Sequence, residues 1–190
     1  METSELIRLL QQVEPHKNED VLLDGDLVPK SASMLVSVLA DKTDPMDRLE
    51  LYTNIIIECG AAGKTEAAVK FAQAQYREFG DVAALIAYSN ALVGNGEFAE
   101  GLIRAKEALE MAIRRQTLIN YAAGNFVRES VKTGSVDAVN AALDALVSST
   151  QVPRTGDCVL EVDWADEAEA LGADVELISW VRSIAVQYRS

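Results

Sequence analysis

Turns built around a glycine recur at a nearly constant spacing in the centre of this 190-residue chain. The turn GNGEF occupies residues 94–98, AAGKT lies 33 residues earlier at 61–65, and KTGSV lies 38 residues later at 132–136. The segments between the turns carry apolar residues at helical spacing, with almost no alternation of period two. A helix pair that cannot bury its apolar face alone must stack on copies of itself, so the sequence predicts stacked helix pairs.

Small residues favour close packing of these predicted helices. Alanine occurs 27 times, and 20 of these alanines fall between residues 61 and 145. Side chains of this size let the axes of paired helices approach each other closely. The helix starts are marked by residues that commonly cap or open a helix, namely Asp44-Pro45, Thr65, Asp81, Glu97 and Ser135. The predicted fold class is therefore all-α.

The two ends of the chain hold most of its negative charge. Residues 1–30 contain seven acids and three bases, and residues 157–190 contain eight acids and two bases. The remaining residues, 31–156, contain fifteen acids and twelve bases and are nearly balanced. Acidic flanks that cover the ends of a helical array are typical of caps, which keep the end repeats soluble.

Composition and helical periodicity divide the chain into three segments of what we expect to be one compact domain. Residues 1–44 form an N-terminal helical flank, with helices at 3–13 and 30–40 around an acidic loop at 15–29. Residues 45–148 hold the helical repeats. Residues 149–190 form an acidic linker followed by a capping helix at 174–188. We assign 159–163 to helix, because an isolated strand there would have no partner.

The segment 82–113, VAALIAYSNALVGNGEFAEGLIRAKEALEMAI, resembles a tetratricopeptide repeat (TPR). The positions that carry the resemblance lie in the first helix, the turn and the second helix: Leu85, Tyr88, Ser89 and Leu92, then Gly96 and Phe98, then Gly101, Ala105 and Ala108. Ala105 stands where the family usually has an aromatic residue, and Ile113 where it has a closing proline. Segments at about 49–80 and 117–148 keep the turn glycine and the helical spacing.

This resemblance implies a TPR-like α-solenoid of stacked antiparallel helix pairs with flanking N- and C-terminal helices. It also implies a function, because in such arrays the first helix of each pair lines a groove that holds a peptide or helix of a partner protein. We therefore expect a non-catalytic protein-protein interaction module or adaptor.

The charge and the apolar runs exclude several other classes. The chain has 17 basic and 30 acidic residues and a net charge of −13, which repels nucleic acids and anionic membranes. No apolar stretch approaches the ~18 residues that span a bilayer, and the N-terminus lacks the pattern of a secretion signal. Cys59 and Cys158 stand in no metal-binding or redox motif. We expect a cytoplasmic protein with free thiols.

Candidate chemical motifs in the sequence all have a simpler interpretation. IIIECGAAGKT at 55–65 ends like a phosphate-binding loop, but Glu58 stands where that loop needs a glycine. His16 is the only histidine, so it has no histidine partner. The acids at Asp24/Asp26 and at Asp163, Asp166, Glu167 and Glu169 lack the spacing of a calcium loop and fit a solvated acidic face. We expect no catalytic residue, no cofactor and no metal.

One helical stripe is the candidate partner-binding surface. Tyr121, Asn125, Arg128 and Lys132 follow one another at i, i+4, i+7 and i+11, and Asn90 holds the corresponding stripe in the preceding pair. Residues 104–132 also hold six bases and three acids. Such a stripe suits an acidic segment or a C-terminal carboxylate of a protein partner, held by charge-assisted hydrogen bonds.

Other interpretations of the same residues stay open. Arg128 and Lys132 can simply be charged residues on a solvent-exposed face of one helix. The chain as a whole can instead be a structural or self-associating subunit of an assembly, with a homodimer formed through its flanking helices. A small nucleotide- or metal-dependent enzyme is a third alternative.

Overall fold

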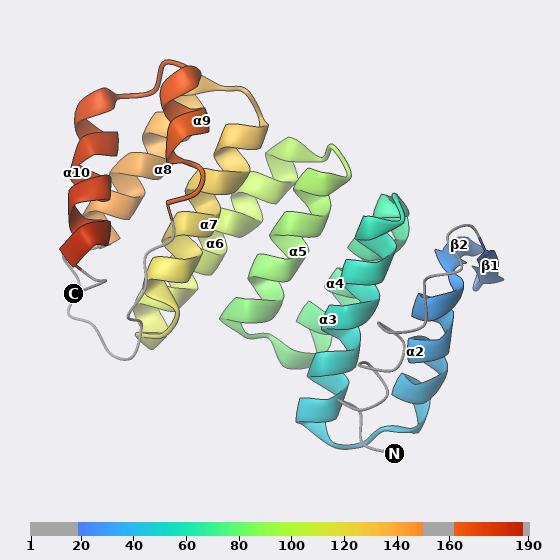
Figure 1. The fold of residues 1–190 in the computed structure, drawn as a ribbon. Helices are drawn as coiled ribbons and strands as arrows, with labels where there is room; N and C mark the ends of the chain where they lie inside the picture. Colours follow the sequence, from blue (N-terminus) through green and yellow to red (C-terminus); the bar gives the residue numbers. More distant parts are fainter. Residues whose placement is uncertain (1–18, 150–161, 188–190) are drawn as a thin grey trace. The chain divides into compact units, whose positions relative to one another are not determined.

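The chain folds into two compact units, Met1–Asn95 and Gly96–Ser190, and the computed structural model describes residues 19–149 and 162–187 (Figure 1). In each unit, helices that follow one another in the sequence are joined by short connections and pack side by side. This arrangement confirms the predicted all-α fold of antiparallel helices packed in adjacent pairs. None of the described helices is long and apolar enough to span a membrane.

The described part of the first unit, residues 19–95, consists of a short hairpin followed by four helices in sequence order. Its elements are β1 (Asp20–Leu23), β2 (Asp26–Pro29), α2 (Lys30–Asp41), α3 (Pro45–Ala61), α4 (Thr65–Phe79) and α5 (Val82–Gly94). Each helix packs on the next one, and the large side chains that are fully buried between them include Leu35, Leu51, Ile55, Leu85 and Leu92.

Within residues 96–149 and 162–187, the second unit has three long helices and two C-terminal ones. Its elements are α6 (Phe98–Arg115), α7 (Ile119–Lys132), α8 (Val136–Ser149), α9 (Ala165–Ala170) and α10 (Val175–Gln187). The central helix α7 packs against both α6 and α8, and α10 packs against α8 and α9. The predicted C-terminal helix at 174–188 is thus confirmed as α10, whereas α9 was not predicted.

Fully buried alanines fill the contacts between successive helices, as their distribution in the sequence predicts. On α6, α7 and α8, the alanines with no exposed surface are Ala105, Ala108, Ala112, Ala122, Ala123 and Ala142. The three turn glycines Gly63, Gly96 and Gly134 share a left-handed backbone, with φ of +72°, +82° and +68°. The repeated turns of the sequence therefore have the same local conformation.

Three predicted helix caps are confirmed, and one is corrected. The side chain of Asp81 accepts a hydrogen bond from the backbone N–H of Ala84 at 2.7 Å, and Asp44 and Ser135 cap α3 and α8 in the same way. Thr65, however, is the first residue of α4, and Lys64 holds the cap position without a side-chain cap.

The predicted loop at 15–29 is wrong over its second half, which forms the β1–β2 hairpin. Asp24 and Gly25 both have positive φ, +49° and +93°, which makes a two-residue turn whose twist matches that of the strands. Val21 pairs with Val28, and the side chain of Val28 is only 1% exposed against the helices. The sequence contains the signal for this hairpin, because Asp-Gly between apolar runs is typical of such a turn.

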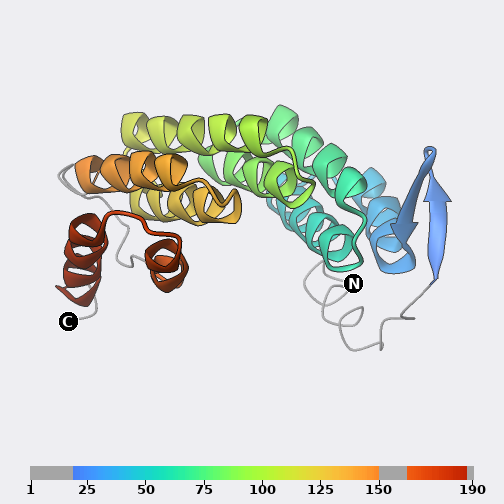
Figure 2. The ribbon, with the colours of Figure 1, turned by 90° about the horizontal axis from the view of Figure 1, so that it is seen from above.

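Ion pairs fasten the hairpin to the helices of the first unit. Asp20 pairs with Lys64, and Asp26 pairs with Lys70 on α4 at 2.6 Å. Glu19 pairs with Lys30 at the start of α2, also at 2.6 Å. Figure 2 shows the hairpin lying alongside α2. Three acids of the predicted acidic loop, Glu19, Asp20 and Asp26, are therefore paired with lysines within this unit.

We expect Gly25→Ala to destabilise the first unit. An L-residue at φ +93° is strained even though the space around Gly25 is open, so the loss is about 1–2 kcal/mol. Gly60→Ala is the matched control, because Gly60 lies in α3, where alanine stabilises a helix by about 0.5–1 kcal/mol. Urea unfolding of the two variants measures whether the free energy of unfolding falls with Gly25→Ala and rises with Gly60→Ala. If both substitutions change this free energy equally, the turn conformation of Gly25 does not contribute to stability.

Some predicted segments lie outside the described residues. The helix at 3–13 does so completely. The helix assigned to 159–163 does so up to residue 161, and its last two residues, Val162 and Asp163, are not helical. The segment that follows, from Asp163 to Ala170, contributes a turn and the short helix α9 to the second unit.

Candidate functional site

The candidate site lies on α7, whose position between α6 and α8 buries it on nearly every side. Its buried residues include four with polar side chains, Asn120, Asn125, Glu129 and Ser130. Ser130 donates to the carbonyl of Phe126 at 2.8 Å, a bond within the helix. The other three polar groups lie at or beside a cavity, so they need a separate explanation.

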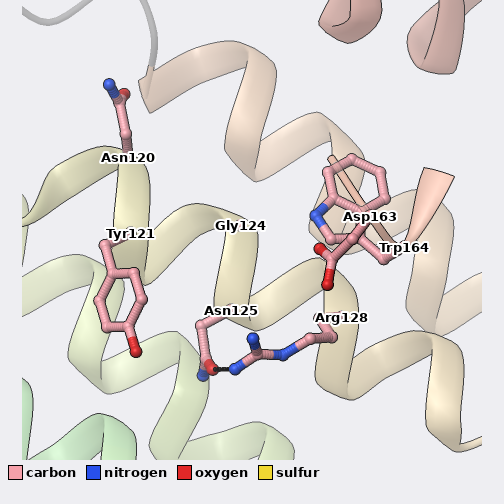
Figure 3. A pocket seen from close by; sticks show the side chains of 7 residues that line it. All are labelled: Asn120, Tyr121, Gly124, Asn125, Arg128, Asp163 and Trp164. Atoms are coloured by element: carbon pink, nitrogen blue, oxygen red, sulfur yellow. Dashed lines mark hydrogen bonds between the residues drawn. The ribbon is translucent and has the colours of Figure 1, made fainter. Parts of the chain in front are cut away.

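A pocket of about 130 Å³ lies between α7 and the segment that leads into α9 (Figure 3). Five of its residues come from α7 and two from the chain just before α9: Asn120, Tyr121, Gly124, Asn125 and Arg128, with Asp163 and Trp164. Gly124 has no side chain, so the pocket reaches the surface of α7 there. Tyr121 is 44% exposed at the rim, whereas Trp164 is 3% exposed and forms part of the wall.

Two asparagines that line this pocket have a buried amide donor without a hydrogen-bond partner among the described residues. Asn120 and Asn125 are 2% and 3% exposed, and the Nδ2 atom of each donates no hydrogen bond within that part of the chain. The orientation of the Asn125 amide is fixed, because its Oδ1 accepts from Nη2 of Arg128 at 2.6 Å. An unpaired buried donor costs about 1–3 kcal/mol. Figure 3 shows the amide of Asn125 beside Arg128 at the pocket, whereas the amide of Asn120 points away from the other lining residues.

A buried carboxylate holds the two basic residues of α7. Glu129 has no exposed side-chain surface and accepts from Arg128 Nε at 3.2 Å and from Lys132 Nζ at 2.8 Å. The three charges together sum to +1. Arg128 uses Nε and Nη2 in these bonds, which leaves Nη1 without a partner among the described residues. The network fixes the guanidinium at the pocket and removes half of the positive charge that the sequence suggests.

The structure brings together three of the five residues that the sequence selects. Tyr121, Asn125 and Arg128 line the pocket, and Figure 3 shows the side chain of Asn125 between the other two. Lys132 is paired with Glu129 and does not line the pocket. Asn90 lies on α5 in the first unit, where its Oδ1 is buried without a partner in the part of the chain that the structure describes. Whether any of these residues binds a partner stays a prediction.

Five residues of the site were not predicted from the sequence: Asn120, Gly124, Glu129, Asp163 and Trp164. Asn120 had a signal, since it is a polar residue inside the apolar run of α7 and directly precedes Tyr121. The sequence carries no signal for the burial of Glu129, because an acid near two bases is ordinarily exposed to solvent. Asp163 and Trp164 lie more than 30 residues further along the chain, and only tertiary packing places them at the pocket.

The other chemical motifs have structural partners in the described part of the chain. Lys64 of the GKT turn pairs with Asp20, and the residues before that turn are helical, so the segment lacks the strand-to-loop form of a phosphate site. Asp166 and Glu169 both bond to Arg182. Among the described residues, no group of acids, histidines or cysteines is placed to hold a metal.

The thiol of Cys59 is buried in α3 and makes no disulfide. Burial, with a smaller contribution from the charge of Glu58, raises the pKa of this thiol to about 11. The nucleophilic thiolate is therefore a very small fraction near neutral pH, which disfavours a catalytic role for this residue. Cys158 and His16 lie outside the described residues.

Comparison of the chain with protein-family models, with curated proteins and with solved structures gave no match. A function for this protein is therefore argued from its own fold and from the pocket on α7.

Proposed function

We propose that the chain is a non-catalytic protein-interaction module that binds a peptide segment of a partner protein in the pocket on α7. The observation that carries the proposal is the amide of Asn125 at the pocket, whose Nδ2 is buried and has no acceptor among the described residues. A ligand that supplies this acceptor would remove the cost of the unpaired donor. Peptides are rich in such acceptors, since every residue brings a carbonyl group.

The remaining walls of the pocket also suit a peptide. Tyr121 and Trp164 offer aromatic surface, and aromatic residues dominate the binding energy of protein interfaces. The volume of about 130 Å³ is close to that of a cavity that holds one benzene ring, ~150 Å³. It therefore accepts one side chain or a short stretch of a peptide, and a partner helix can insert only a single residue.

Two further parts of the proposal concern the repeats and the compartment. We infer that the helix pairs are TPR-like, which the shared conformation of Gly63, Gly96 and Gly134 supports. We also assign the chain to the cytoplasm, which the free thiol of Cys59 supports, because disulfides are rare in reducing compartments.

Selection of binders from a displayed random-peptide library tests the proposed function. With a selected peptide, we expect Tyr121→Ala to lower the affinity about tenfold, because an exposed aromatic residue at a pocket rim is a common hot spot. Phe98→Ala is the control, since Phe98 is 42% exposed at the start of α6 and lies outside the pocket. Calorimetry gives both affinities.

The proposal is contradicted if the library yields no binder. It is also contradicted if the binders lose as much affinity with Phe98→Ala as with Tyr121→Ala. Charge reversal of Arg128 and Lys132 is a poorer test. Both residues pair with the buried Glu129, so glutamates at these positions would place three acids together and endanger the fold.

A further inference from the structure

We infer that the group held in the pocket is a primary carboxamide, the side-chain amide of a glutamine in the bound peptide. Its oxygen accepts a hydrogen bond from Arg128, and its NH₂ group donates one to Asp163. This inference rests on the proposed function and names the side chain that the pocket selects. It differs from the sequence-based expectation of a carboxylate ligand, and the difference comes from the charge of Asp163.

Arg128 provides the donor on the α7 wall. Its Nε bonds to Glu129 at 3.2 Å and its Nη2 bonds to Asn125 at 2.6 Å, so the guanidinium has a fixed orientation. Its Nη1 has no partner among the described residues. The side chain of Arg128 is 29% exposed, so a ligand is able to reach it, in contrast to the buried Nδ2 of Asn125. The pocket therefore offers one oriented and charged donor to an oxygen atom of the ligand.

Asp163 provides an acceptor on the wall that faces α7. It is exposed and has no ion-pair partner among the described residues. Figure 3 shows its carboxylate pointing toward the side chain of Arg128, but the two residues form no ion pair with each other. Two opposite charges that line one pocket without touching leave room for a group that accepts from one and donates to the other.

The balance of charge at the pocket disfavours a simple ion. The two cations Arg128 and Lys132 and the two anions Glu129 and Asp163 sum to zero. A carboxylate ligand would be repelled by Asp163, and an ammonium ligand would be repelled by Arg128. A primary carboxamide is neutral and carries both an acceptor oxygen and a donor NH₂ group, so it suits both residues.

The size of the pocket favours a side-chain amide over a main-chain amide. A main-chain amide is flanked by chain atoms on both sides, whereas the amide of glutamine ends its side chain and fits a volume of about 130 Å³. The two methylene groups of glutamine then pack against the aromatic surface of Tyr121 at the rim and Trp164 in the wall. Glutamine therefore satisfies the polar and the apolar parts of the pocket together.

Blocked amino acids without another primary amide test this inference. The probes are the N-acetyl N-methylamides of glutamine, glutamate and leucine, each titrated into the full chain carrying Trp180→Phe. The chain has two tryptophans, so Trp164 is then the only indole, and its emission reports binding in the pocket. We expect the glutamine derivative to bind at least about tenfold more tightly than the other two, because each of them loses a charge-assisted hydrogen bond.

Asp163→Asn is expected to reverse the preference between the glutamine and glutamate derivatives, because asparagine removes the repelling charge and donates to a carboxylate. Asp144→Asn is the matched control and should keep the preference for glutamine. Asp144 is an exposed acid on α8 outside the pocket, and its replacement changes the net charge by the same amount.

Three results would each overturn the inference. The first is a glutamate or leucine derivative that binds as tightly as the glutamine derivative, and the second is an Asp163→Asn variant that keeps the original preference. The third is the absence of any change in emission with the glutamine derivative at millimolar concentration. In each of these cases, library peptides that depend on Tyr121 would still support the proposed function.

Discussion

Asn120→Leu is expected to raise the free energy of unfolding of the second unit by about 1–3 kcal/mol, which is the cost of a buried donor without a partner. Asn120 is 2% exposed, and its Nδ2 donates no hydrogen bond among the described residues. Leucine has the same branching pattern, so it replaces the two polar atoms by methyl groups without changing the shape of the side chain. Urea unfolding followed by Trp164 emission in a Trp180→Phe background measures the change.

Asn140→Leu is the matched control for this prediction. Its Oδ1 accepts from the backbone N–H of Asp174 at 2.9 Å, so leucine there removes a made hydrogen bond, and we expect a loss of about 1 kcal/mol. The two substitutions are chemically identical, but we expect them to change the free energy of unfolding in opposite directions. A loss of stability with Asn120→Leu would mean that the side chain of Asn120 stabilises the fold and is not an unpaired donor.

Glu129→Gln is expected to destabilise the second unit by about 2–3 kcal/mol. Glutamine keeps the shape of Glu129 but leaves the cations of Arg128 and Lys132 without a counter-charge. Removal of one partner from a buried ion pair ordinarily costs about 3–5 kcal/mol. We expect the lower value because the side chains of Arg128 and Lys132 are 29% and 47% exposed, so water compensates them in part.

Glu110→Gln supplies the comparison for Glu129. Glu110 pairs with Arg114 at 3.9 Å on the surface of α6, where the two side chains are 53% and 67% exposed. Such a pair contributes about 0–1 kcal/mol, so its loss should be small. If the two glutamine variants unfold at the same urea concentration, the buried network on α7 has no special role in fixing Arg128 at the pocket.

The helices of this fold were largely predictable, because their signals are local. The glycine turns, the caps at Asp44, Asp81 and Ser135, and the distribution of alanine depend only on neighbouring residues. The hairpin was predictable too, from Asp24-Gly25 between two apolar runs. It was missed because the expectation of an acidic loop took no account of turn chemistry.

The pocket was only half predictable. Helical spacing alone places Tyr121, Asn125 and Arg128 on one stripe of α7, and the structure has them in one pocket. The opposite wall depends on tertiary packing that brings Trp164 to α7, and no local pattern encodes it. The charge of the stripe was overestimated, because burial of Glu129 between two bases cannot be inferred from their order in the sequence.

The proposed function is tested most directly at the amide of Asn125. The measurement is the ¹H–¹⁵N spectrum of the asparagine side chains, recorded with and without a peptide selected from the library. We expect the Nδ2 protons of Asn125 to shift downfield and to exchange more slowly with water when the peptide is bound, while those of Asn140 stay unchanged. A peptide that binds tightly and leaves Asn125 unshifted would contradict the proposal.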